Sequence, residues 1–220
     1  MAIDRQTWSP PASASRLQSR VQKSRVPGAL YGSLLLDQPR HRAFRDRIVA
    51  FVQPGPPLAV EIGFDHGINL LANARLFPQT KWLGVEIRRR RVEAVVTSAP
   101  GNCLPVRLDA RTLFASLIPS QRVVRVDIYF PTPALKASHA LFSPEFAADL
   151  HNALAPSGVL YICTDVPALA DQCRALFAAW PEADPLPRAP DLSRRERVCQ
   201  RDGLTIHELT LHPPSVPPLG

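Results

Sequence analysis

From about residue 58 onward, continuous apolar runs alternate with segments whose apolar residues recur at helical spacing. Uninterrupted apolar runs are typical of strands buried on both faces of a parallel sheet, and the segments between them are typical of covering helices. The pattern therefore predicts an α/β fold with a mostly parallel sheet and helices on both faces. The expected strands are LAVEIG (58–63), KWLGVEI (81–87), CLPVRLD (103–109), RVVRVDIYF (122–130) and GVLYICTD (158–165).

Helical patterns follow each of these strands, and the last apolar stretch has a different period. Ser143, with Pro144 and Glu145 directly after it, is a typical helix start. The stretch LTIHELTL (204–211) alternates apolar and polar residues, which predicts a late antiparallel strand. The expected helices are INLLANARLF (68–77), RRRVEAVVTSA (89–99), ARTLFASLI (110–118), SPEFAADLHNALA (143–155) and PALADQCRALFAAW (167–180).

The 24 prolines gather at the two ends of the chain and in its connections. This distribution predicts three regions. Residues 1–50 form a basic N-terminal extension, partly helical or mobile, whose best helix is HRAFRDRIVAFV. Residues 51–212 form the folded domain, and residues 213–220 form a Pro-rich tail.

Composition narrows the class of protein further. A length of 220 residues with 45% hydrophobic and 20% charged residues suits one globular domain. The net charge of +7 favours an anionic partner, nucleic acid first, although a basic surface without any partner has the same charge. The four cysteines form no CxxC pair, so we expect no metal site, no disulfide framework and a cytoplasmic location. No run is long enough to span a membrane, and no membrane association is expected.

Acidic residues follow the predicted strands at the point where each strand ends. Glu61 lies near the end of the first strand, Glu86 near the end of the second, Asp109 after the third and Asp165 after the fifth. Ligands of such sheets bind at the carboxyl ends of the strands. The sequence therefore predicts that these carboxylates converge on one acidic crevice.

The turn GFDHG (63–67) bears on which cofactor this crevice would hold. A pyrophosphate prefers a helix N-terminus without nearby carboxylates, whereas Glu61 precedes the turn and Asp65 lies inside it. S-adenosylmethionine fits better, because its cationic end suits the acidic turn and Glu86 can accept both ribose hydroxyls. Asp109 would then accept the adenine amino group. The alternative is that Gly63 and Gly67 only permit a tight turn.

Six short segments resemble the bacterial tRNA (guanine-N7)-methyltransferases. They agree with that family in order and spacing from about Val60 to Leu211. The resemblance implies a Rossmann-like methyltransferase fold over the 51–212 domain, S-adenosylmethionine as cofactor and guanine in tRNA as the ancestral substrate. The segments are VEIGFDHG, WLGVEIRR, RLDA, IYFPTPALK, LAPSGVLYICTD and SRRE (193–196).

The same resemblance assigns roles to individual positions. Cofactor-binding residues would be Glu61, Gly63, Gly67, Glu86 and Asp109. Substrate-binding residues would be Lys136, Asp165, Ser193 and Glu196. Thr132 and Asp165 are the candidate catalytic residues, because Thr132 stands where the family has an acid and Asp165 or Glu196 would take over its charge.

Departures from the family pattern fall mainly on the RNA side. Asp65 replaces the middle glycine of the turn, Thr132 an acid, and Ala134 a tryptophan. The family's basic loop is ASHALFS here, which weakens the expected grip on tRNA. Arginines at 88–91 are interpreted as a solvated helix face, and those at 193–201 leave phosphate binding open. Three functions follow: a tRNA methyltransferase, a methyltransferase of a small heteroaromatic substrate, or a catalytically silent RNA- or protein-binding homologue.

Overall fold

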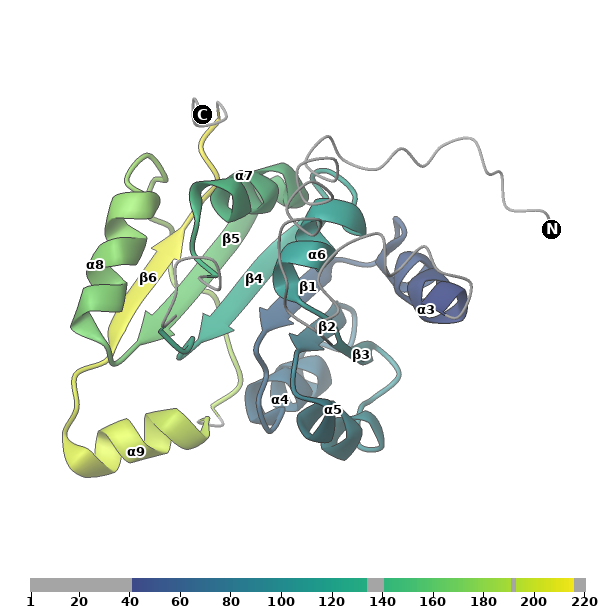
Figure 1. Ribbon diagram of the computed structural model, residues 1–220, viewed down its shortest axis with the longest axis horizontal. Helices are drawn as coiled ribbons and strands as arrows, with labels where there is room; N and C mark the ends of the chain where they lie inside the picture. Colours follow the sequence, from purple (N-terminus) through teal and green to yellow (C-terminus); the bar gives the residue numbers. More distant parts are fainter. Residues whose placement is uncertain (1–40, 134–140, 191–192, 216–220) are drawn as a thin grey trace, which may run out of the picture.

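The computed structural model describes residues 41–133, 141–190 and 193–215. Its centre is a six-stranded sheet in the order β3-β2-β1-β4-β5-β6, in which β1 to β5 pair in parallel and β6 pairs antiparallel with β5 (Figure 1). This arrangement confirms the predicted α/β fold and its late antiparallel strand. The strands are β1 Leu58–Ile62, β2 Lys81–Glu86, β3 Cys103–Arg107, β4 Val123–Tyr129, β5 Leu154–Thr164 and β6 His207–Leu211.

Seven helices are described alongside these strands. Among the described residues, no helix is long and apolar enough to cross a membrane. Strand β5 begins at Leu154 rather than at Gly158 as expected, because its pairing with β4 continues past a register shift at Val123/Arg125. The helices are α3 Arg42–Val52, α4 Ile68–Leu76, α5 Arg89–Val96, α6 Ala110–Ser116, α7 Pro144–Ala153, α8 Pro167–Leu176 and α9 Arg194–Asp202.

The two faces of the sheet carry different hydrophobic clusters. Successive residues of a strand point to opposite faces, and in β1 Leu58 and Val60 join the larger cluster while Ala59 joins the smaller one. The larger cluster includes side chains of α6, α7 and α8, and the smaller one is closed by α4 and α5. Helices therefore cover both faces, as the sequence predicts.

Beside the smaller cluster, the same face of the sheet is polar where β4 and β5 lie. Arg125 Nε donates to both carboxylate oxygens of Asp127, at 2.8 and 3.0 Å, and both side chains are buried. Arg125 Nη1 also donates to the carbonyl oxygen of Pro187, and the backbone N–H of Ala189 donates to Asn73 Oδ1 at 2.7 Å. These buried bonds fix the segment between α8 and α9 over this half of the face.

Helix α9 was not expected from the sequence, and its ends are well defined. Ser193 Oγ accepts from the backbone N–H of Glu196, and the Glu196 carboxylate accepts from the backbone N–H of Ser193. This reciprocal pair is a capping box, which satisfies N–H groups that the first turn leaves free. Gly203, in a left-handed conformation at φ 65°, ends the helix.

Candidate active site

A cavity of about 860 Å³ opens at the carboxyl ends of the parallel strands. It is lined by the turn between β1 and α4, by the residues that follow β2 to β5, and by the start of α9. Two predicted site residues, Gly67 and Glu196, are not among the lining residues, and Lys136 lies outside the described residues. The predicted residues that line the cavity are Glu61, Gly63, Glu86, Asp109, Thr132, Asp165 and Ser193.

The turn between β1 and α4 has an unusual backbone. Gly63, Asp65 and Gly67 all have positive φ, at 73°, 46° and 71°. The Gly63 N–H donates to the carbonyl of Val85 at 2.8 Å, which ties the turn to β2. A Cβ atom at Gly67 would come within 2.8 Å of Val95, so this glycine also lets α4 approach α5 closely. Asp65 is the non-glycine residue among these three positions of positive φ.

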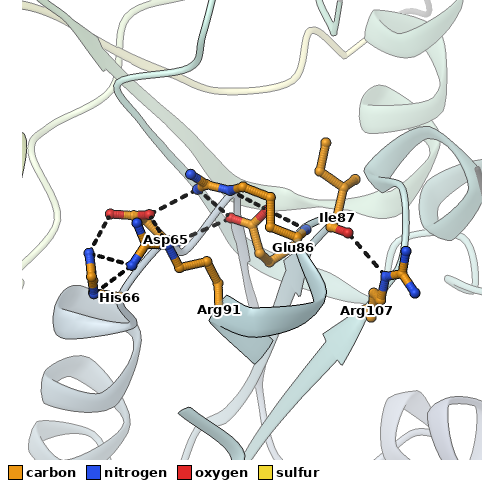
Figure 2. A network of polar contacts seen from close by, with 7 residues as sticks. Asp65, His66, Glu86, Ile87, Arg91 and Arg107 are labelled. Carbon is orange, nitrogen blue, oxygen red and sulfur yellow. Dashed lines mark hydrogen bonds and ion pairs between the residues drawn. The ribbon is translucent and has the colours of Figure 1, made fainter. Parts of the chain in front are cut away.

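Asp65 and Glu86 share one arginine across the cavity wall. Arg88 Nη2 lies 2.9 Å from Asp65 Oδ1 and 2.9 Å from Glu86 Oε2, while its Nε donates to Glu86 Oε1 at 3.1 Å. Asp65 also pairs with Arg91 at 3.0 Å, and His66 and Arg91 gather beside it (Figure 2). The N–H groups of Asp65 and Arg88 complete the bonds to Glu86, so each oxygen of that carboxylate accepts two.

Asp109 repeats this arrangement after β3. Its Oδ1 accepts from the backbone N–H of Arg111 at 2.8 Å and caps helix α6. The Arg111 guanidinium bonds both carboxylate oxygens, at 3.1 and 3.0 Å. At two strand ends, therefore, an acid is paired with an arginine two residues later.

These pairs correct the expectation of an acidic crevice. The lining carboxylates are Glu61, Asp65, Glu86, Asp109 and Asp165, and the lining arginines are equally numerous: Arg88, Arg91, Arg111, Arg194 and Arg195. Among the arginines at 88–91, Arg89 and Arg90 are exposed and absent from the lining, in keeping with a solvated face. Arg88, which is also exposed, and Arg91 line the cavity and pair with Asp65.

Glu61 differs from the other lining acids because no arginine among the described residues bonds its carboxylate. Its side chain is 2% exposed, and among the described residues its Oε2 has no hydrogen-bond partner. Burial raises the pKa of Glu61 well above its ordinary value, and the nearby carboxylate of Asp127 raises it further. Asn69, a position that no sequence motif indicates, also lines the cavity with both amide atoms buried and without described partners. These orphaned polar atoms are suited to a polar ligand.

The β4–β5 side of the cavity holds the residues predicted to act on substrate. Thr132 lies between Pro131 and Pro133 on the cavity wall. Asp165 follows β5 and accepts from Arg195 of α9, whose hydrogen bond lowers the pKa of this carboxyl below its ordinary value. Asp165 is consequently ionised at neutral pH and fixed toward the start of α9.

The side chains of Ser193 and Glu196 make their contacts within the protein. Ser193 lines the cavity, but its Oγ caps α9. Glu196 is 2% exposed, and its carboxylate bonds Arg188 at 2.7 Å and the Ser193 N–H at 2.7 Å. Glu196 therefore holds α9 in place, and Asp165 is the carboxylate that this side presents to the cavity.

The fold and the cavity define an α/β methyltransferase. A solved structure described as an antibiotic-related methyltransferase superposes with a TM-score of 0.56 at 11% identity, over 76% of this chain and 94% of that one. The family "Putative methyltransferase" matches residues 56–202, and the chain belongs to it. It is an S-adenosylmethionine-dependent methyltransferase that resembles the tRNA (guanine-N7)-methyltransferases, as its motifs predict.

Two relatives of that name illustrate the extent of the similarity. The tRNA (guanine-N(7)-)-methyltransferase of Leifsonia xyli subsp. xyli is 32% identical over 173 residues, which cover 71% of this chain and 76% of the relative. The enzyme of the same name from Psychromonas ingrahamii is 29% identical over 133 residues, and this chain spans only 55% of its length.

Proposed function

We propose that this protein transfers a methyl group from S-adenosylmethionine to N7 of a guanine in tRNA, in the cytoplasm. The observation that carries the proposal is one cavity that unites the strand-end acids Glu61, Glu86 and Asp109 with Asp165. The names of the relatives supply the acceptor, since they are tRNA (guanine-N7)-methyltransferases.

The residues of the β1–β3 side fit the methyl donor. Glu86 would accept the two ribose hydroxyls in place of the Arg88 guanidinium, and Asp109 would accept the adenine amino group. The buried and unpartnered Oε2 of Glu61 suits the ammonium group, because a cation would offset the cost of ionising a buried carboxyl. Gly63 would allow the cofactor to approach the backbone of the turn. S-adenosylmethionine supplies an electrophilic methyl group when bound, and these side chains bind and orient it.

The chemistry at the acceptor needs position more than proton transfer. Guanine N7 carries a lone pair and no proton, so alignment of the two reactants can supply most of the acceleration, at best about 7–11 kcal/mol. Asp165, held ionised by Arg195, can accept hydrogen bonds from the N–H groups of a guanine and offset the positive charge that develops on the base. Thr132 adds a hydroxyl on the same wall but no charge.

A smaller acceptor is the second candidate function. Thr132 stands between two prolines without a charge, and Ala134 of the sequence supplies no aromatic ring for a base to stack on. Stacking of that kind is worth about 1–3 kcal/mol. A small heteroaromatic molecule could enter the same cavity without a grip on RNA.

Transfer of a labelled methyl group distinguishes these functions. The purified protein is given labelled S-adenosylmethionine with tRNA that lacks N7-methylguanine, and in parallel with a small-molecule cell extract. We expect label in tRNA, mapped to N7 of guanine, and its loss in Glu86→Gln but not in the exposed control Glu93→Gln. Label only in the extract would support the small acceptor. Absence of label together with absence of cofactor binding by calorimetry would support a silent homologue.

A further inference from the structure

Helix α9 presents a row of arginines on its exposed side. Arg194, Arg197 and Arg201 are spaced i, i+3 and i+7, which places them on one face of the helix, and all three are exposed. The opposite face contains the buried Glu196 and Cys199. The row extends about 10 Å along the helix axis, from seven steps of about 1.5 Å. We call these three residues the arginine row.

The arginine row is held in a fixed position relative to the cavity. The capping box orders the first turn of the helix. Arg188 donates to the buried Glu196, and Arg195 donates to Asp165 at the end of β5. Arg194 lines the cavity itself. Figure 1 shows α9 beyond the arrowhead of β5, and the start of this helix lines the cavity. The row therefore begins at the cavity and leads away from it over the surface.

The charges of this row are less compensated than those of the opposite wall. Arg88, Arg91 and Arg111 are each bonded to a carboxylate of the cavity. Among the described residues, Arg194 and Arg197 have no ion pair, and Arg201 has only its exposed neighbour Asp202. Exposed pairs of this kind are worth little, so the row retains its attraction for anions.

We propose that the arginine row binds the phosphate backbone of RNA next to the nucleotide that enters the cavity. This inference rests on the proposed function, from which it takes RNA as the partner. Guanidinium groups bind phosphate oxygens through paired hydrogen bonds, and exposed arginines without acidic partners bind them at the smallest cost. The chain carries a net charge of +7, which favours an anionic partner. The row supplies phosphate contacts next to the cavity.

A matched pair of triple variants tests the proposal. R194Q/R197Q/R201Q removes the row and leaves Ser193, Arg195 and Glu196 in place, so the cap of α9 is retained. R42Q/R47Q/R174Q removes the same charge at exposed arginines that do not line the cavity. Dissociation constants for unmodified tRNA are measured from 50 to 200 mM salt, and calorimetry gives the affinity for S-adenosylmethionine.

Loss of the row should weaken tRNA binding at least tenfold, and the control triple should stay within about threefold of the parent. The slope of log affinity against log salt should become shallower by about 2 for the row variant, since each phosphate contact contributes about 0.7 for single strands. R197Q/R201Q, which leaves the cavity lining unchanged, should show about two thirds of that change and keep the parental affinity for the cofactor. Equal effects of the row and control triples would overturn the proposal.

Direct binding separates this inference from the proposed function. If tRNA binds through the row but receives no methyl label, the proposed function fails and the row remains an RNA-binding surface. If tRNA is methylated and both triple variants bind it equally well, the proposed function stands and the proposal for the arginine row fails. A parent protein that binds tRNA no more tightly than heparin would also overturn the proposal for the arginine row.

Discussion

The two walls of the cavity use charge in different ways. On the β1–β3 wall, Glu86 and Asp109 are each paired with an arginine two residues along the chain, so acid and base come from the same strand end. On the β5–α9 wall, Asp165 is paired with Arg195 of another element, and Arg194 has no acidic partner among the described residues. Local pairs keep the first wall neutral and polar, which suits a small cofactor. The second wall retains positive charge, which suits a polyanion.

The largest expected effect concerns the local pair on the cofactor wall. Glu86→Gln removes the charge of an acceptor that two ribose hydroxyls would share, and each hydrogen bond to a charged group is worth about 1.5–3 kcal/mol. We expect the affinity for S-adenosylmethionine to fall about 100-fold by calorimetry. Glu93→Gln, an exposed acid of α5, is the control and should bind as the parent does. Unchanged binding in Glu86→Gln would mean that the ribose binds in another part of the cavity.

The opposite wall should respond in transfer rather than in cofactor binding. Asp165→Asn removes the carboxylate charge that we propose to act on the acceptor base. The rate of methyl transfer to tRNA should fall about 30-fold, while the affinity for S-adenosylmethionine stays within about twofold. Because Arg195 lowers the pKa of Asp165, this carboxyl stays ionised from pH 6 to pH 9 and should add no inflection to the pH–rate profile. Equal losses of transfer and cofactor binding would contradict the division between the walls.

The fold and the acidic strand ends could be predicted because they depend on local pattern. Uninterrupted apolar runs mark parallel strands, and residues that end parallel strands meet at one edge of the sheet. The arginine partners could not be predicted from composition. In the run 88–91 only Arg88 and Arg91, three residues apart, share the face toward Asp65, and the pattern of the run does not show which face turns inward.

The start of α9 shows that one sequence motif can be interpreted in two ways. Ser193 and Glu196 have the spacing of a capping box, a local signal that predicts a helix start. The resemblance assigns the same pair to substrate binding instead of to a helix start. The burial of Glu196 depends on Arg188, and the position of Arg188 depends on the buried bonds of the segment before α9. Such contacts are made by tertiary packing and have no signal in the sequence.

Glu61 offers a test through stability, because among the described residues no arginine bonds this acid of the β1–β3 wall. Its pKa is raised in the folded protein, so folding takes up a proton above the unfolded pKa of about 4.3. The free energy of unfolding should therefore fall as pH rises above that value, by up to about 1.4 kcal/mol per pH unit, until the folded pKa is reached. Glu61→Gln removes this dependence. Urea unfolding of both proteins at pH 5, 6 and 7 should show the free energy of unfolding of Glu61→Gln rising relative to that of the parent as pH increases. Parallel plots of this free energy against pH would contradict the assignment.

The smallest expected effect concerns Asp65, the residue that shares Arg88 with Glu86. Asp65→Asn keeps a side chain that tolerates positive φ but removes the charge, so Arg88 would rely on Glu86 alone. The ribose hydroxyls would then compete with a more tightly held guanidinium, and the affinity for S-adenosylmethionine should fall about fivefold. Asp65→Gly should lose the same affinity while gaining stability, because it removes the cost of a left-handed non-glycine residue, about 1 kcal/mol. In an Arg88→Gln background neither substitution at Asp65 should change cofactor affinity further, and a persisting effect would show that Asp65 acts on the cofactor directly.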